Sequence, residues 1–271
     1  MVGLLGGCAT DGEAGTPFIT ATRGAQQDAL QGLAPTDVWL LGEQHDAPAH
    51  QARQRDVMAA LQTQGVLAAL VIELAERGGS TRGLPANASE LQVQQALRWS
   101  ASEAAGWEWA VYGPMVMQAV RAQVPVLGGN LPRAELRAAM QDTALDQGIA
   151  PATWQTQQAN IREGHCQLLP ESQVIPMTRV QLARDVSMAH TIETVLVPGK
   201  TVLLVAGNQH VRRDLGVPQH LTPSVRSTVV LMASGSDGEG PANANTADQV
   251  WRTARMPEQD HCAAFKAQMK P

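Results

Sequence analysis

Two stretches decide the expected fold of this chain: Val38-Trp39-Leu40-Leu41-Gly42-Glu43-Gln44-His45 and Val202-Leu203-Leu204-Val205-Ala206-Gly207-Asn208-Gln209-His210. Each contains a short apolar run, typical of a buried strand, that ends at a glycine and leads into a Gly-x-x-His motif. In open parallel sheets, ligands bind beyond the carboxyl ends of the strands. We therefore expect His45 and His210 to meet across one crevice, although 165 positions separate them.

The rest of the chain alternates further strand patterns with helical ones. The predicted strands are Asp37–Leu41, Ala69–Leu74, Val124–Leu127, Thr201–Ala206 and Ser227–Met232. Ala49–Gln64 has helical spacing and predicts the crossover helix of a βαβ unit. Pro114–Arg121 predicts a second helix with its proline in the first turn. This alternation predicts an α/β fold with a mainly parallel sheet flanked by helices.

Two long segments interrupt the alternation, at about residues 78–109 and 134–190. Both are rich in Gln and Ala and helical in pattern, so we predict helical insertions that form a lid over the carboxyl ends of the strands. The expected organisation is one domain over residues 31–271, preceded by a truncated lipoprotein signal and tether over residues 1–30.

The composition excludes several classes of protein. The chain has 271 residues, 44% of them hydrophobic, which is enough to bury a core. A net charge of −5 and no Lys/Arg cluster exclude nucleic acid as a partner. No apolar segment approaches the roughly 20 residues of a spanning helix. Gly-x-Ser-x-Gly, Walker and dinucleotide-binding motifs are missing, which makes serine hydrolase and nucleotide-binding functions weak hypotheses.

The first residues, Met1-Val2-Gly3-Leu4-Leu5-Gly6-Gly7-Cys8, resemble the end of a bacterial lipoprotein signal. They predict lipidation of Cys8 and a lipid-anchored protein in the bacterial cell envelope; the alternative is an ordinary apolar N-terminus. Of the three cysteines, Cys166 and Cys262 would then remain as a pair. They form either a disulfide, as an oxidising compartment permits, or two unrelated free thiols.

Polar groups gather at the predicted strand ends: Glu43 and His45 after the first, Glu73 in the second and His210 after the fourth. A charge inside an apolar strand is costly unless it is paired or ligated, so Glu73 needs a partner. Imidazole and carboxylate together suit a divalent transition metal, or a general base beside an electrophile. The alternative is a structural network of Glu–His or Glu–Arg pairs that holds the loops.

Tyr112 is the only tyrosine of the chain and stands in an aromatic segment, Trp107-Glu108-Trp109-Ala110-Val111-Tyr112. Its position before Pro114 predicts a loop or the start of a helix rather than the core. A tyrosine phenolate is one of the known axial ligands of haem iron. The alternative is a tyrosine that fills the junction of helix and sheet and bonds to the backbone.

These motifs, in their order, resemble the ChaN-type iron-regulated lipoproteins, a haem-binding family of the wider Tiki/TraB superfamily. The resemblance covers about residues 30–265. It is carried by Leu40-Leu41-Gly42-Glu43-Gln44-His45-Asp46, Trp109-x-x-Tyr112-x-Pro114, Gly128-Gly129-Asn130-Leu131-Pro132-Arg133, His165-Cys166, Gln181-x-x-Arg184-Asp185-x-x-Met188-Ala189, Ala206-Gly207-Asn208-Gln209-His210-Val211-Arg212, Gly216-Val217-Pro218 and the late Cys262.

The resemblance implies an exported, lipid-anchored haem-binding protein that serves haem or iron acquisition as a homodimer. Tyr112 is then the candidate iron ligand, and His50, His165 and His190 are candidates for the propionate or second axial role. Distant Tiki relatives imply an alternative, a metal-dependent hydrolase that uses Glu43, His45, Glu73 and His210. A third hypothesis is an envelope scaffold in which the polar crevice only braces the loops.

Overall fold

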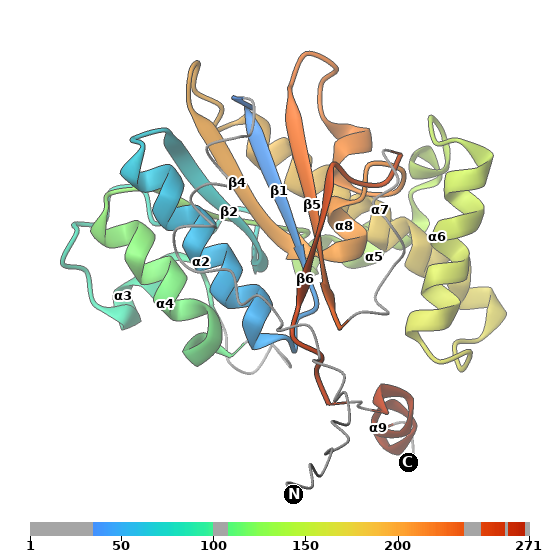
Figure 1. Cartoon of the computed structure of the whole chain (residues 1–271). Coiled ribbons are helices and arrows are strands. Elements are labelled where there is room, and N and C mark those ends of the chain that lie inside the picture. The colour runs from blue at the N-terminus through green and yellow to red at the C-terminus, as the bar shows by residue number, and fades with distance from the viewer. Residues whose placement is uncertain (1–34, 100–107, 236–244, 258–259, 269–271) are drawn as a thin grey trace, which may run out of the picture.

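The computed structural model describes residues 35–99, 108–235, 245–257 and 260–268. Its centre is a six-stranded sheet in the order β3-β2-β4-β1-β5-β6, in which every strand pair is parallel (Figure 1). The strands are β1 (Val38–Glu43), β2 (Leu67–Glu76), β3 (Val126–Asn130), β4 (Thr201–Gly207), β5 (Ser227–Ser234) and β6 (Gln249–Thr253). Parallel strands direct all their carboxyl ends to one edge of the sheet, where the Gly-x-x-His motifs begin.

The five predicted strands are confirmed, because their apolar runs are buried on both faces of the sheet. β1 lies in the middle, between β4 and β5, and every one of its residues is buried. β6 was not predicted. Its sequence, Gln-Val-Trp-Arg-Thr, is only partly buried at the sheet edge and lacks the apolar run of a central strand.

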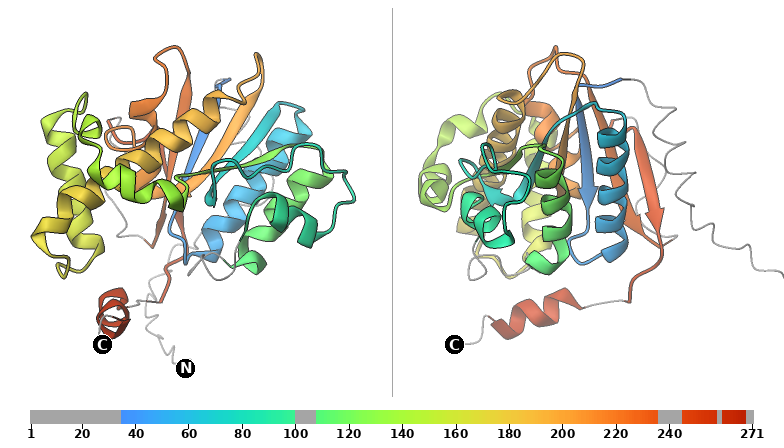
Figure 2. Two further views of the ribbon diagram at one scale, coloured as in Figure 1. Left: turned by 180° about the vertical axis from the view of Figure 1, so that it is seen from behind. Right: turned by 90° about the vertical axis from the view of Figure 1, so that its left-hand side faces the viewer.

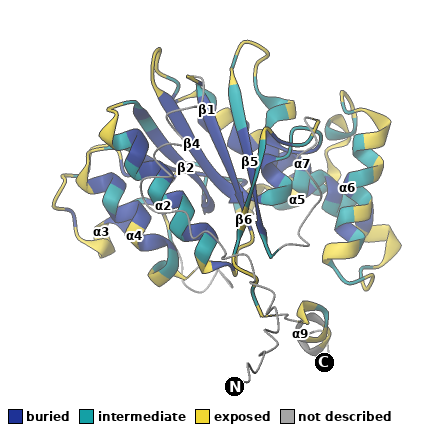
Figure 3. Cartoon of the chain, in the orientation of Figure 1, coloured by how far each residue is buried: buried dark blue, intermediate teal, exposed yellow. Residues whose placement is uncertain are grey.

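One face of the sheet is covered by α2 (Pro48–Thr63) and α4 (Trp109–Arg121), with α3 (Glu90–Ala96) packed beside α4 (Figure 2). Side chains of β1, β2, β4 and β5 that point to this side form one core with Met58, Leu61 and Met115 of the helices. Figure 3 shows the buried residues concentrated in the sheet and the facing helix surfaces. The α2 helix confirms the predicted crossover at Ala49–Gln64.

The opposite face is covered by α7 (Glu171–Glu193), which comes from the second predicted insertion. Met188, Ala189 and Ile192 of α7 pack on Val71 and Leu204 of the sheet in a second core. This insertion therefore completes a layer of the fold. The shorter elements α5 (Leu136–Gln141) and α6 (Pro151–Gly164) pack against the outer side of α7.

The prediction that Pro114 opens a helix is wrong. The α4 helix begins at Trp109, so Pro114 lies inside it. A proline there removes one intrahelical hydrogen bond. Burial of Tyr112, Met115 and Val116 on one side of the helix extends the apolar face across the proline and outweighs that loss.

Gly128 allows β3 to approach β2 closely, and we expect Gly128→Ala to destabilise the fold by about 1–3 kcal/mol, as overpacking does. A Cβ at this position would collide with the carbonyl oxygen of Glu76 and lie 2.7 Å from that of Ala75, both backbone atoms that cannot rotate away. The measurement is the urea midpoint of unfolding. Gly129→Ala is the control.

A Cβ at Gly129 meets only side-chain carbons of Met188 and Val71, both at 3.0 Å, which can shift. Equal midpoints for the two variants would contradict the packing argument.

Candidate functional site

The structure brings the predicted crevice residues together at the carboxyl edge of the sheet. His210 Nε2 lies 3.3 Å from Glu73 Oε1, and the backbone N–H of Gly207 donates to Glu73 Oε2 at 2.8 Å. A Cβ at Gly207 would lie 3.0 Å from His45 Nε2 and 3.6 Å from Glu73 Oε2, so both motifs border the same carboxylate. We name Glu43, His45, Glu73, Asp185 and His210 the rim cluster.

His210 lies between two buried carboxylates. Its Nδ1 is 2.6 Å from Asp185 Oδ1 of α7, and the Gln181 amide nitrogen is 3.0 Å from Nε2. Burial alone lowers the pKa of His210, but the charges of Glu73 and Asp185 outweigh it and raise the pKa to about 10. Burial also acts to raise the pKa of Glu73, yet His210 and His45 hold it well below its usual range. His210 and Glu73 are therefore a charged pair at neutral pH.

Asp185 behaves differently from Glu73. Burial raises the pKa of Asp185 to about 6, against the opposing charge of His210. Its Oδ2 has no hydrogen-bond partner among the described residues, which removes the usual stabilisation of a buried carboxylate.

Glu43 is held by four side chains. Tyr112 donates its hydroxyl to Oε1 at 2.8 Å, and His45 Nδ1 lies 2.8 Å from the same oxygen. Gln51 and Gln54 of α2 donate to Oε2 at 2.9 and 2.7 Å. Burial lowers the pKa of His45, but the hydrogen bond with Glu43 and the charges of Glu73 and Glu43 produce a net increase. The His45 side chain is 39% exposed, so it is the member of the rim cluster that solvent reaches most easily.

The chemistry of the rim cluster is that of a closed network of carboxylates and imidazoles. Its polar atoms are occupied mainly by one another, as the structural-network hypothesis expects. In the described part of the chain, no group of three or more His, Cys, Asp or Glu side chains is arranged to hold a metal ion. The predicted divalent metal and the metal-dependent hydrolase therefore gain no support from the structure.

Sequence analysis missed three members of this network: Gln51, Gln54 and Asp185. A signal was available for each, because a buried polar residue interrupts the apolar face of a helix. Gln54 and Asp185 are both fully buried, and Asp185 lies one turn before the core residue Met188.

The structure corrects the predicted environment of Tyr112. The residue lies in α4 with 1% of its surface exposed, rather than in a loop. Burial and the neighbouring Glu43 carboxylate raise the pKa of its phenol far above the usual range, so the phenolate is strongly disfavoured. Its hydroxyl also lies 3.4 Å from the backbone oxygen of His45. The role of Tyr112 as an iron ligand stays a prediction.

The three other predicted haem-site histidines lie apart. His50 is fully buried; its Nδ1 accepts the N–H of Gln44 at 3.0 Å and its Nε2 lies 3.1 Å from Thr253 Oγ1. His165 is partly buried at the end of α6, with Nδ1 2.7 Å from the carbonyl oxygen of Ile161. His190 is exposed near the end of α7.

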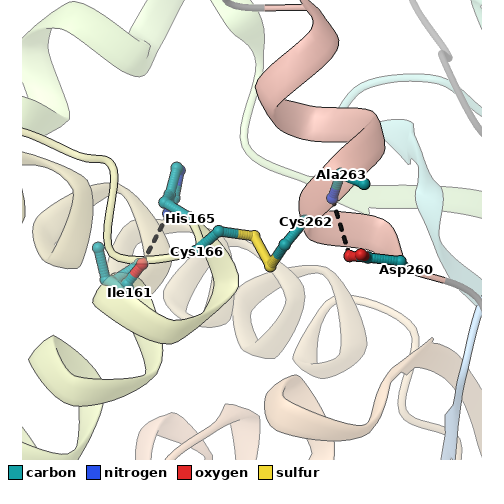
Figure 4. The surroundings of a disulfide bond; sticks show 6 residues. All are labelled: Ile161, His165, Cys166, Asp260, Cys262 and Ala263. Carbon is teal, nitrogen blue, oxygen red and sulfur yellow. Dashed lines mark hydrogen bonds between the residues drawn. A yellow bond between two sulfur atoms is a disulfide. The ribbon is translucent and has the colours of Figure 1, made fainter.

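Cys166 and Cys262 are joined by a disulfide with a Cα–Cα distance of 5.5 Å (Figure 4). The bond ties the end of α6 to α9 (His261–Gln268). His261 Nε2 also lies 3.4 Å from Asp46 Oδ2, next to His45. The other predicted cysteine site, Cys8, lies outside the described residues.

A separate open groove runs between α5 and α7, with a volume of about 650 Å³. Its apolar lining is formed by Leu131, Ala138, Ala139, Leu145, Ala183 and Val186, and its polar lining by Arg77, Glu135, Asp142, Ser187 and His190. No helix in the described ranges has the length and apolarity needed to cross a membrane.

The parallel sheet, the helical layers and the two Gly-x-x-His motifs at one edge define a class of α/β proteins with a polar rim. The family model for haem-binding uptake proteins of the Tiki superfamily, ChaN, matches residues 29–221. The chain therefore belongs to the ChaN family, as its motifs predicted.

Comparison with solved structures supports the same fold. ChaN of Campylobacter jejuni, in a structure described as cofacial haem binding, superposes with a TM-score of 0.64 at 23% identity, covering 83% of this chain and 90% of that one. The type III effector HopBA1 gives a TM-score of 0.43 at 14% identity, covering 86% and 92%. A Bacillus cereus protein gives 0.42 at 14% identity, covering 84% and 75%. No curated protein matches this chain significantly.

Proposed function

We propose that this chain binds haem and serves haem or iron acquisition as a lipid-anchored protein of the bacterial envelope. The observation that carries the proposal is the match of the haem-binding ChaN family to residues 29–221. Haem would supply a redox-active iron, and the residues of this chain would bind and orient it.

The side chains of the described residues fit a haem ligand of the imidazole type. Proximal histidine is a common axial ligand of haem iron, and His190 presents its ring at the surface. Tyr112 and His50 are buried and hydrogen-bonded, so an iron ligand from either would require part of the core to open.

Two further features support the envelope location. The Cys166–Cys262 disulfide suits an oxidising compartment, where such bonds persist. The sequence around Cys8 resembles a lipidation site. Metabolic labelling with a fatty acid, lost in Cys8→Ser, would test the anchor.

A homodimer belongs to the same proposal. It is supported by family membership and by the cofacial haem arrangement described for the Campylobacter jejuni protein. The molar mass in solution, measured by light scattering with and without haemin, tests it. A monomer under both conditions would contradict it.

Titration of the purified protein with haemin should give a saturable Soret shift at one haem per chain. Tyr112→Phe should leave this shift in place, because the phenol is buried and donates to Glu43. If the variant loses the shift while its far-UV circular dichroism stays native, tyrosinate ligation is correct. Absence of any shift in the wild type would refute the proposed function.

A further inference from the structure

We propose that the groove between α5 and α7 is the haem seat of this chain and that His190 supplies the iron ligand. The inference rests on the proposed haem binding and adds the site and the ligand. It starts from the combination of an apolar concavity and one exposed imidazole in the same lining.

The groove has the size and polarity of a cofactor site. Its volume of about 650 Å³ falls within the roughly 300–1,000 Å³ that ligand pockets occupy. Val186 is 40% exposed within it, although large aliphatic side chains are usually covered. A flat apolar ring system such as a porphyrin would remove this surface from water.

Helical spacing places the apolar lining and the imidazole on one side of α7. Ala183, Val186, Ser187 and His190 follow one another at intervals of three or four residues and all line the groove. His190 is therefore directed by the same helix face that forms the apolar wall. Among the described residues, no hydrogen bond to its ring is present that iron ligation would have to break.

The charged groups of the groove leave its apolar part accessible. The Arg77 guanidinium lies 2.7 Å from the Glu135 carboxylate and donates to Ser187 Oγ at 3.1 Å. Asp142 accepts the N–H of Ala144 at 2.9 Å. Arg77 and Glu135 neutralise each other, so the groove selects a ligand mainly by apolar area and by coordination to His190.

The rim cluster does not offer an equivalent seat. Glu73 and His210 are at most 5% exposed and bind to each other and to Asp185 or Gly207. A macrocycle could reach them only by displacing the core.

The experiment compares two probes, haemin and metal-free protoporphyrin, on four variants of the full chain. His190→Ala removes the proposed ligand, and His165→Ala is its matched control on α6. Ala138→Trp fills the groove from an exposed position, and Ala159→Trp on an exposed position of α6 is its control.

His190→Ala should weaken haemin binding at least about tenfold, because even residues that only orient a metal ligand contribute about 10–100-fold. It should change the binding of metal-free protoporphyrin little, since that ring has no iron to coordinate. Ala138→Trp should weaken both probes, and both controls should behave as wild type.

If wild type binds haemin and neither His190→Ala nor Ala138→Trp changes binding, the groove assignment is wrong and the proposed function stands. Loss of haemin binding in His165→Ala alone would move the ligand to that residue and overturn the assignment. If the wild type binds neither probe, the proposed function itself fails.

Discussion

Glu73→Ala is expected to destabilise the fold by about 3–5 kcal/mol, the cost of removing one partner of a buried ion pair. The change leaves the His210 imidazolium against Asp185 alone and removes the acceptor of the Gly207 N–H. Glu73 also lies in β2, whose neighbours β3 and β4 depend on its position. Urea unfolding followed by circular dichroism measures the loss.

Glu73→Gln is the matched control, because it keeps an acceptor for Gly207 and removes only the charge. It should also change the pH dependence of stability. The pKa of His210 is raised to about 10 in the folded protein, above its ordinary value of 6.5. Its contribution to stability is therefore complete below pH 6.5 and is lost as the pH rises towards 10.

In Glu73→Gln this loss should begin at lower pH, since one of the two carboxylates that raise the pKa of His210 has gone. Glu73 and Asp185 keep their charges between pH 7 and 9 in the wild type, so they do not obscure the comparison. Parallel stability profiles of wild type and Glu73→Gln over that range would contradict the paired state of His210.

Reduction of the Cys166–Cys262 bond is expected to lower the free energy of unfolding by up to about 4–5 kcal/mol, the chain-entropy value for a loop of nearly a hundred residues. The two cysteines are 96 positions apart, and the loop between them contains α7, β4, β5 and β6. The measurement is urea unfolding with and without dithiothreitol, in a Cys8→Ser background that prevents exchange.

The double variant Cys166→Ser with Cys262→Ser serves as the control for side effects of the reductant. It should unfold at the midpoint of the reduced protein and show no response to dithiothreitol. Identical midpoints for the oxidised protein and the double variant would mean that the bond fixes only the terminal helix α9.

The central part of the fold could be predicted from sequence because burial on both faces requires a continuous apolar run. Val38–Leu41 and Val202–Ala206 carry that signal without ambiguity. The edge strand β6 carries no such signal, since polar and aromatic residues suit a half-covered position. The start of α4 was misplaced because Pro114 is a strong local signal that tertiary packing overrides.

The site could be predicted only in part for a related reason. Histidines that follow strand ends identify a rim, and His45 and His210 do approach the same carboxylate, Glu73. The carboxylate partner Asp185 lies in a helix that the sequence connects to the sheet only through its apolar face. The groove depends on how α5 packs against α7, which no local pattern encodes.

The central position of β1 has a consequence for the order of events during synthesis. Its two neighbours, β4 and β5, lie far downstream; Thr36 and Thr201, which join the start of β1 to that of β4, are 165 positions apart. A nascent chain on the ribosome therefore carries an unpaired apolar segment until most of the polypeptide has emerged. Truncation before β4 removes both neighbours of β1, so shortened forms of this protein lack the middle of their sheet.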